Sequence, residues 1–294
     1  MSHRELTVPE NGASDRLPGS GFDWRSGRVS VVVGSIIAIL VIAIALIGPL
    51  VYPASPTTQD LAMRLQPPVG FGGTWQFPLG TDQLGRNLLA RVIAGARLSL
   101  AISAAAIMAC AVIGAVIGIA SGSTKGFPTG VVGWLVDLVA VLPFIVVAIA
   151  TATVIGQGIP NVLFVLVFTG WVVFARVIRL QTQVIRQSPY VEASRAMGST
   201  DLWRLRHHVL PGLVPILVVI ASQQVAAMIL YEGALNFLGL GVGGKWVTWG
   251  GMAADGVDAV VRAPWVVIVP GVAIGLTVLA ANLVADAIVP PARV

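Results

Sequence analysis

The chain has 294 residues, of which 56% are hydrophobic and only 11% are charged. A soluble domain carries about 25% charged residues, so the composition excludes a soluble protein and indicates one that crosses a lipid bilayer several times. The net charge of +5 is spread over polar segments. This spread is typical of basic loops beside membrane spans and argues against nucleic acid as a partner.

The first 24 residues are rich in Pro, Gly, Ser and charged residues and show no apolar periodicity. We expect residues 1–24 to form a disordered cytoplasmic tail and residues 25–294 to form one transmembrane domain. A helix needs about 20 apolar residues to cross the hydrocarbon layer. Counting uncharged stretches predicts six spans, at about 29–51, 98–122, 130–153, 160–178, 211–233 and 264–287.

Two of these spans come from one long apolar stretch, residues 126–175, whose only charged residue is Asp137. The turn-forming residues at 156–161 divide the stretch into a hairpin. In the second predicted span, Gly114 and Gly118 form a G-x-x-x-G step that predicts close helix packing.

An even number of spans places both termini on one side of the membrane. With the N-terminus inside, twelve Lys and Arg residues are cytoplasmic and six lie outside. This excess predicts cytoplasmic termini.

A polar segment, residues 181–210, separates the fourth and fifth predicted spans. Pro189 suits the first turn of a helix, Gly198 suits a left-handed helix end, and Ser199 and Thr200 suit the start of a second helix. We therefore expect two short helices joined at a glycine and lying along the membrane surface. The residues alone leave open whether this surface docks a soluble partner or packs on lipid headgroups.

Glu192-Ala193-Ser194 with Gly198, and Pro78-Leu79-Gly80-Thr81-Asp82 with Gly85-Arg86, belong to a series of motifs along the chain. This series resembles the motifs of ABC importer permeases, in particular the C-type subunit of dipeptide, oligopeptide and nickel importers. The loop resembles the E-A-A-x3-G-x9-I-x-L-P motif of that family, although Ser194 replaces an alanine and His208 replaces an aliphatic residue. The resemblance extends from about residue 25 to 287, and the family's usual C-terminal R-D-x-L-D-P run is absent. The segments that carry it are Glu192-Ala193-Ser194, Gly198, Leu210-Pro211, Pro78-Leu79-Gly80-Thr81-Asp82, Gly85-Arg86, Gly95 to Leu100, and Glu232 to Gly241.

The resemblance implies an all-α polytopic membrane protein with the type I ABC importer permease fold, six transmembrane helices and cytoplasmic termini, in the bacterial cell membrane. It implies a non-catalytic subunit, and the sequence contains no G-x-x-x-x-G-K-[ST] phosphate loop. ATP and Mg²⁺ are then expected on one or two partner ATP-binding subunits, with no cofactor or metal bound by this chain. The other expected partners are a homologous permease, forming a heterodimer, and an extracytoplasmic substrate-binding protein.

The resemblance also suggests which residues act. The residues expected to couple the chain to an ATPase are Tyr190, Val191, Glu192, Ala193, Ser194, Met197, Gly198, Leu210 and Pro211. Ionisable groups inside membrane spans are costly and often functional, so three polar residues are candidates for the translocation pathway: Asp137, Glu232 and Asn236. For Asp137 an interfacial anchor, and for Glu232 a position facing outer solvent, remain alternatives.

Peptides are the expected cargo, with nickel or another small solute as the alternative. Two other protein classes remain. A secondary transporter needs intramembrane charges or broken helices at mid-membrane, and this sequence has very few such charges. A membrane scaffold would explain the docking loop but not the ordered series of motifs.

Overall fold

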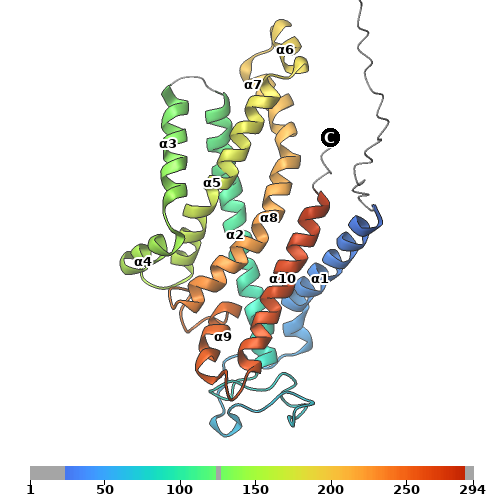
Figure 1. Cartoon of the computed structure of the whole chain (residues 1–294), viewed down its shortest axis with the longest axis vertical. Coiled ribbons are helices and arrows are strands. Elements are labelled where there is room, and N and C mark those ends of the chain that lie inside the picture. Colours follow the sequence, from blue (N-terminus) through green and yellow to red (C-terminus); the bar gives the residue numbers. More distant parts are fainter. Residues whose placement is uncertain (1–23, 124–126, 289–294) are drawn as a thin grey trace, which may run out of the picture.

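The computed structural model of the chain describes residues 24–123 and 127–288, so the tail predicted for residues 1–24 lies outside the described residues except for Trp24. Over the described ranges the regular structure is helical, apart from one isolated bridge between Thr81 and Asn87. Figure 1 shows long helices that run between two ends of the molecule. We call these the α6 end, formed by α6 (Pro189–Ala196) and α7 (Asp201–Arg204), and the α9 end, formed by residues 52–87 and α9 (Trp249–Gly256).

Within residues 24–123 and 127–288, five helices are each long and apolar enough to cross a membrane. They are α1 (Trp24–Val51), α2 (Leu88–Ser123), α5 (Ile159–Arg186), α8 (Leu210–Phe237) and α10 (Trp265–Ile288). Two shorter helices, α3 (Phe127–Val141) and α4 (Phe144–Ile155), pass the same test only as a pair. The remaining elements are η1 (Leu61–Met63), α6 (Pro189–Ala196), α7 (Asp201–Arg204), the π-helical turn η2 (Leu205–Val209), α9 (Trp249–Gly256) and η3 (Val257–Ala259).

The prediction of one continuous helix over 130–153 is wrong, because α3 and α4 are bent by 87° relative to each other. The break falls at Pro143, which cannot donate a helical hydrogen bond and disfavours the helical conformation of the residue before it. The six-span prediction therefore corresponds to five single helices plus one broken pair. The predicted turn at 156–161 is confirmed at its start, where Gly156 and Gly158 have φ of 85° and 146° between α4 and α5.

Three predicted spans are shorter than the helices that contain them. Helix α2 begins at Leu88 rather than near 98, α5 continues to Arg186 rather than 178, and the helix predicted at 211–233 begins its helical run at Asp201. Charged residues lie within these helices without ending them, and some form ion pairs, as Arg91 does with Asp82 and Asp255. A stretch of uncharged residues marks only the part of a helix that lies inside the hydrocarbon layer. The 36 residues of α2 extend roughly 54 Å, so this helix is longer than the layer is thick.

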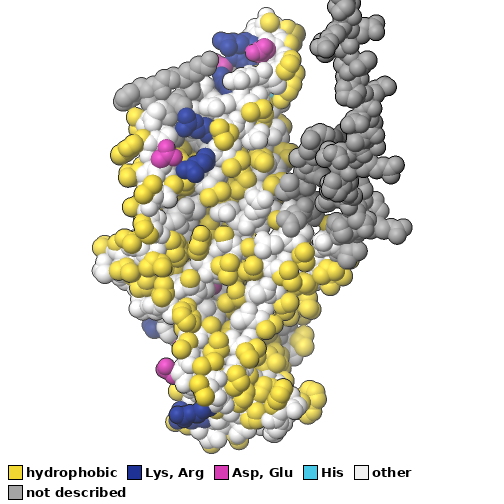
Figure 2. All heavy atoms as spheres, viewed as in Figure 1, with side chains coloured by type: hydrophobic (Ala, Val, Ile, Leu, Met, Phe, Trp, Pro, Cys, Tyr) yellow, Lys and Arg dark blue, Asp and Glu magenta, His cyan; other side chains and the backbone are white. Residues whose placement is uncertain are grey.

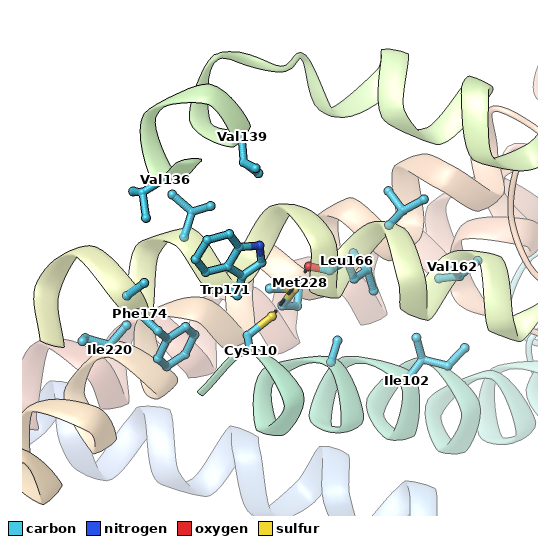
Figure 3. Packing of buried hydrophobic residues seen from close by; sticks show 14 of the residues in the cluster. Ile102, Cys110, Val136, Val139, Val162, Leu166, Trp171, Phe174, Ile220 and Met228 are labelled. Carbon is cyan, nitrogen blue, oxygen red and sulfur yellow. Dashed lines mark hydrogen bonds between the residues drawn. The ribbon is translucent and has the colours of Figure 1, made fainter. Parts of the chain in front are cut away.

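The centre of the bundle is the contact of α2 with α5 and α8. A Cβ atom at Gly114 would lie 2.4 Å from the Cβ of Phe174, and one at Gly118 would lie 2.8 Å from the carbonyl oxygen of Ala175. These glycines let the two backbones approach closely, as the G-x-x-x-G step predicts. Figure 3 shows Cys110 of α2 beside Trp171 and Met228, and it is fully buried.

Helices α1 and α10 pack beside this centre and against α2, α8 and α9. In Figure 1 the first residues of α1 and the last residues of α10 lie toward the α6 end, so the two described ends of the chain are on the same side. Figure 2 shows hydrophobic side chains over much of the surface between the two ends. The helix surface is thus suited to contact with lipid.

Candidate functional site

The segment between α5 and α8 forms a helix–glycine–helix unit at the α6 end. Helix α6 has Pro189 in its first turn, as predicted, and ends before Gly198, whose φ of +86° is the left-handed conformation that glycine tolerates. Thr200 then caps α7 by accepting a hydrogen bond from the Trp203 backbone N–H at 3.3 Å. The predicted helix from Pro189 and its left-handed end at Gly198 are confirmed, but α7 is not a separate short helix, because its helical run continues through η2 into α8.

The two helices are tied together by the side chains of Ser194, Ser199 and Arg204. The Ser199 hydroxyl donates to the Ser194 carbonyl at 2.7 Å, and the two hydroxyl groups lie 2.8 Å apart. The buried Arg204 side chain donates to the Ser199 carbonyl, to the Ser199 hydroxyl at 3.1 Å and to the Asp201 carboxylate at 2.5 Å. The serine that replaces the alanine of the motif therefore bonds across the glycine junction.

His208 occupies the aliphatic position of the motif and joins α6 to the start of α8. Its ring packs edge-on against Tyr190 at a centroid distance of 5.4 Å and against Trp203 at 5.2 Å. Aromatic pairs in this geometry contribute about 0.5–1.5 kcal/mol beyond the area they bury. The neighbouring His207 instead stacks on the outer side with Trp203 at 4.5 Å. The two histidines thus have separate packing roles.

The coupling candidates divide into inward and outward groups. Val191 and Ser194 are each 4% exposed and hold the unit against the spans. The outward group, on which a partner could rest, consists of Tyr190, Glu192, Ala193, Met197, Gly198, Leu210 and Pro211. Met197 of this group and Leu202 of α7 are the most exposed large apolar side chains of the unit, at 82% and 74%. Large apolar side chains exposed at the end of a bundle are typical of an interaction surface.

A cavity of about 610 Å³ lies between this unit and the adjoining helix ends. Arg186, Arg195, Arg204 and Glu192 line it together with Gly122 of α2. Arg186 also reaches Asp201 at 3.4 Å, so α5 is linked to α7 by charge as well as by the chain. The unit and the adjoining helix ends are therefore separated by a cavity lined with charged side chains, not by a densely packed apolar contact.

Of the three pathway candidates, Asp137 lies on the surface of the isolated chain. Its carboxylate is 3.2 Å from the Arg176 guanidinium of α5, and the two side chains are 74% and 54% exposed. Asp137 lies in α3 six residues before Pro143, and Arg176 lies ten residues before the end of α5. An exposed ion pair this far inside apolar helices needs a polar environment or a second protein surface.

Glu232 and Asn236 form a buried cluster near the end of α8. The Asn236 amide donates to the Glu232 carboxylate at 2.6 Å, and the Val242 backbone N–H donates to Asn236 at 2.9 Å. Glu232 is 1% exposed, whereas Asn236 borders a cavity of about 700 Å³ at the α9 end.

The α9 end contains a second charged cluster, which includes two residues of the P-L-G-T-D-x-x-G-R motif. Asp82 accepts from Arg86 Nε at 2.6 Å and lies 3.5 Å from Arg91 Nε. Both arginines reach Asp255 next to α9's end, at 3.2 and 3.1 Å. This cluster fastens the 52–87 segment to α2 and α9.

A family model described as "Binding-protein-dependent transport system inner membrane component" matches residues 114–292. The chain belongs to this family. A second family model, described as "N-terminal TM domain of oligopeptide transport permease C", matches residues 29–68. These matches confirm the importer permease of C type that the motifs indicated, in the bacterial inner membrane.

Relatives and solved structures agree with this assignment. The chain is 35% identical to the di/tripeptide transport system permease protein DppC of Pseudomonas aeruginosa over 86% of this chain and 84% of that protein. It is 36% identical to the glutathione transport system permease protein GsiD of Pectobacterium atrosepticum, over 71% and 69%. A structure titled "Inward facing conformations of the MetNI methionine ABC transporter" shares the fold, with a TM-score of 0.54 and 20% identity over 68% of this chain and 97% of that one.

Three contributors to these sites were not among the residues singled out from the sequence. The sequence patterns identify Ser199 only as the start of a helix and identify neither Arg204 nor Asp255. Asp255 lies 164 residues from its partner Arg91. For Arg204, the spacing of three residues from Asp201 was the available signal, because residues three apart face each other on a helix.

Proposed function

We propose that this chain is a membrane-spanning subunit of an ATP-driven importer, and that it forms half of a translocation pathway. Partner ATP-binding subunits dock on the outward face of α6 and α7. The observation that carries the proposal is the helix–glycine–helix unit itself, whose apolar residues Met197 and Leu202 are exposed while Arg204 and Ser194 fix its shape. A rigid unit with an exposed apolar face is suited to transmit a displacement from a partner to the spans.

The chemistry of ATP hydrolysis is assigned to the partners. ATP and Mg²⁺ bind there, and this chain contributes no catalytic residue and holds no cofactor. The absence of a phosphate loop from the sequence supports this division. The α6 end, together with both termini, then faces the cytoplasm, in agreement with the excess of basic residues on that side.

The second half of the pathway is a homologous permease. The surface of α3 and α5 that carries the Asp137–Arg176 pair faces this partner or the pathway between the two, since the pair is exposed in the isolated chain. Asn236 lines the entrance from the α9 end, and Glu232 holds its amide in place from one helical turn away.

Peptides are the proposed cargo, because the similar proteins named above carry the descriptions di/tripeptide and glutathione transport. A substrate-binding protein delivers the cargo to the α9 end, where residues 52–87 and α9 form the exposed surface. Nickel or another small solute is the second candidate, because the P-L-G-T-D-x-x-G-R segment resembles one that marks the branch of the family with both peptide and nickel importers. Identification of the ligand of the cognate binding protein distinguishes the two.

The coupling role is tested by Gly198→Val in the assembled importer. A β-branched side chain is strongly disfavoured at a positive φ, and no other atom lies within 4 Å of the Cβ position, so the substitution acts on the turn alone. Gly156→Val is the matched control, since Gly156 has φ +85°, equally open surroundings and a place in the turn between α4 and α5. We expect Gly198→Val to reduce ATPase association or substrate-stimulated ATPase activity and Gly156→Val to preserve both. Full association and stimulation in Gly198→Val would contradict the coupling role.

A further inference from the structure

A groove of about 1000 Å³ lies between α1, α2 and the segments that meet at the α9 end. Its walls are apolar and include Ile42 and Leu46 of α1 and Ile93 and Leu98 of α2. Ile42 and Leu46 are 50% and 66% exposed, so the groove opens to the surface of the bundle. It shares no lining residue with the cavity of the α6–α7 unit, and it adjoins the cavity that borders Asn236 through Thr57, Trp246 and Val247.

Two cations lie at the rim of this groove, Arg97 and Lys245. Among the described residues neither forms a salt bridge or a side-chain hydrogen bond, whereas Arg86 and Arg91 of the same end are both paired. Arg97 directly precedes the uncharged stretch that starts at Leu98, which places it at the boundary of the hydrocarbon layer. An arginine at that depth needs an anionic partner or access to headgroups.

The aromatic residues that line the groove with the two cations are of the types found at membrane interfaces. Tyr52 and Trp246 line the same groove, and Trp246 is 55% exposed. Tyrosine and tryptophan are enriched where headgroups meet hydrocarbon. The groove therefore has a cationic and aromatic rim above an apolar floor.

We propose that this groove binds one phospholipid with a negatively charged headgroup. The phosphate contacts Arg97 and Lys245, and an acyl chain lies along Leu46 and Leu98. Guanidinium groups bind phosphate through paired hydrogen bonds, and basic pockets beside transmembrane helices recognise anionic headgroups. A helix of a partner protein fits less well, because an apolar helix would leave both cations unpaired.

The first test measures lipid retention by the full chain with native mass spectrometry in detergent, with phosphatidylglycerol and phosphatidylcholine as probes. We expect tight retention of one phosphatidylglycerol, and about 30-fold weaker binding in the Arg97→Gln, Lys245→Gln double variant. The matched control is Arg262→Gln, since Arg262 is an exposed cation of the α9 end that does not line the groove. Equal retention in the double variant and the control would overturn the proposal.

The second test leaves both cations in place and does not depend on the folding of the double variant. A photo-cross-linking residue at position 46 is activated in the assembled importer in vesicles that contain phosphatidylglycerol. Cross-linking to lipid is the expected result. Cross-linking to the partner permease in place of lipid would overturn the proposal, while leaving the coupling role of α6 and α7 unaffected.

Discussion

At the α9 end one cluster of charged side chains lies inside the fold, whereas at the α6 end most charged side chains lie on the surface. Asp82 and Arg91 are 3% and 5% exposed and belong to a cluster that joins three segments. At the other end Asp201 is 75% exposed, and only its partner Arg204 is buried. Buried ion pairs are costly to break, and exposed pairs contribute little. The α9 end is thus built to stay fixed, and the α6 end to present a surface.

The turn glycines of the two ends differ in the same way. A Cβ atom at Gly85 would lie 1.7 Å from the Asp60 carbonyl oxygen. A Cβ atom at Gly198 would have no atom of a neighbouring residue within 4 Å. Both glycines have a positive φ. Gly85 is therefore required by close packing and by backbone conformation, and Gly198 by backbone conformation alone.

Among the variants that test this difference between the two ends, Asp82→Ala is expected to lower stability the most. Its loss leaves Arg91 buried with only the half-exposed Asp255 as partner, and breaking a buried pair costs about 3–5 kcal/mol. Thermal unfolding in detergent measures the effect. Asp258→Ala is the control, because Asp258 is exposed at the same end and has no ion pair within the described ranges. Equal stability of the two variants would show that the cluster does not fix this end.

Alanine at Gly85 and at Gly198 compares the two turns directly. Gly198→Ala is expected to lower the free energy of unfolding by about 1–2 kcal/mol, the cost of a left-handed alanine. Gly85→Ala must in addition displace the Asp60 backbone and is expected to destabilise more. Chemical denaturation of both variants gives the order, and a larger loss at Gly198 would reverse the comparison.

Removal of the Arg204 side-chain charge tests how the α6 end keeps its shape. Arg204→Met retains the apolar stem but loses the hydrogen bonds to Ser199 and Asp201. Because the donor is charged, their loss is expected to lower stability by about 2 kcal/mol. We expect lower substrate-stimulated ATPase activity with the spans still folded. Arg206→Met, an exposed neighbour, is expected to behave as the parent chain. Full substrate-stimulated ATPase activity in Arg204→Met would show that coupling does not require the Arg204 guanidinium.

His208 is expected to have the smallest effect. His208→Phe keeps an aromatic ring against Tyr190 and Trp203, whereas His208→Ala removes it and loses about 1 kcal/mol. The stability difference between the two variants measures the packing contribution of the ring. Equal stability would mean that the two edge-on contacts contribute nothing.

Much of this architecture follows from the sequence because it rests on local patterns. Apolar runs gave the helices, and Gly198 gave the junction of α6 and α7. The break at Pro143 was missed, since a count of uncharged residues does not register a proline inside a span. Contacts between distant segments, such as Arg91 with Asp255, depend on how the chain returns on itself, and no spacing rule encodes that.

The most direct test of the account uses a single cysteine at position 197. The native Cys110 is fully buried, so a Met197→Cys chain offers one accessible thiol on the proposed docking face. We predict that assembly with the ATP-binding subunits protects this thiol from a maleimide reagent, while Val261→Cys, 93% exposed at the α9 end, stays reactive. Equal labelling of Met197→Cys with and without the ATP-binding subunits would contradict the docking of an ATPase on α6 and α7.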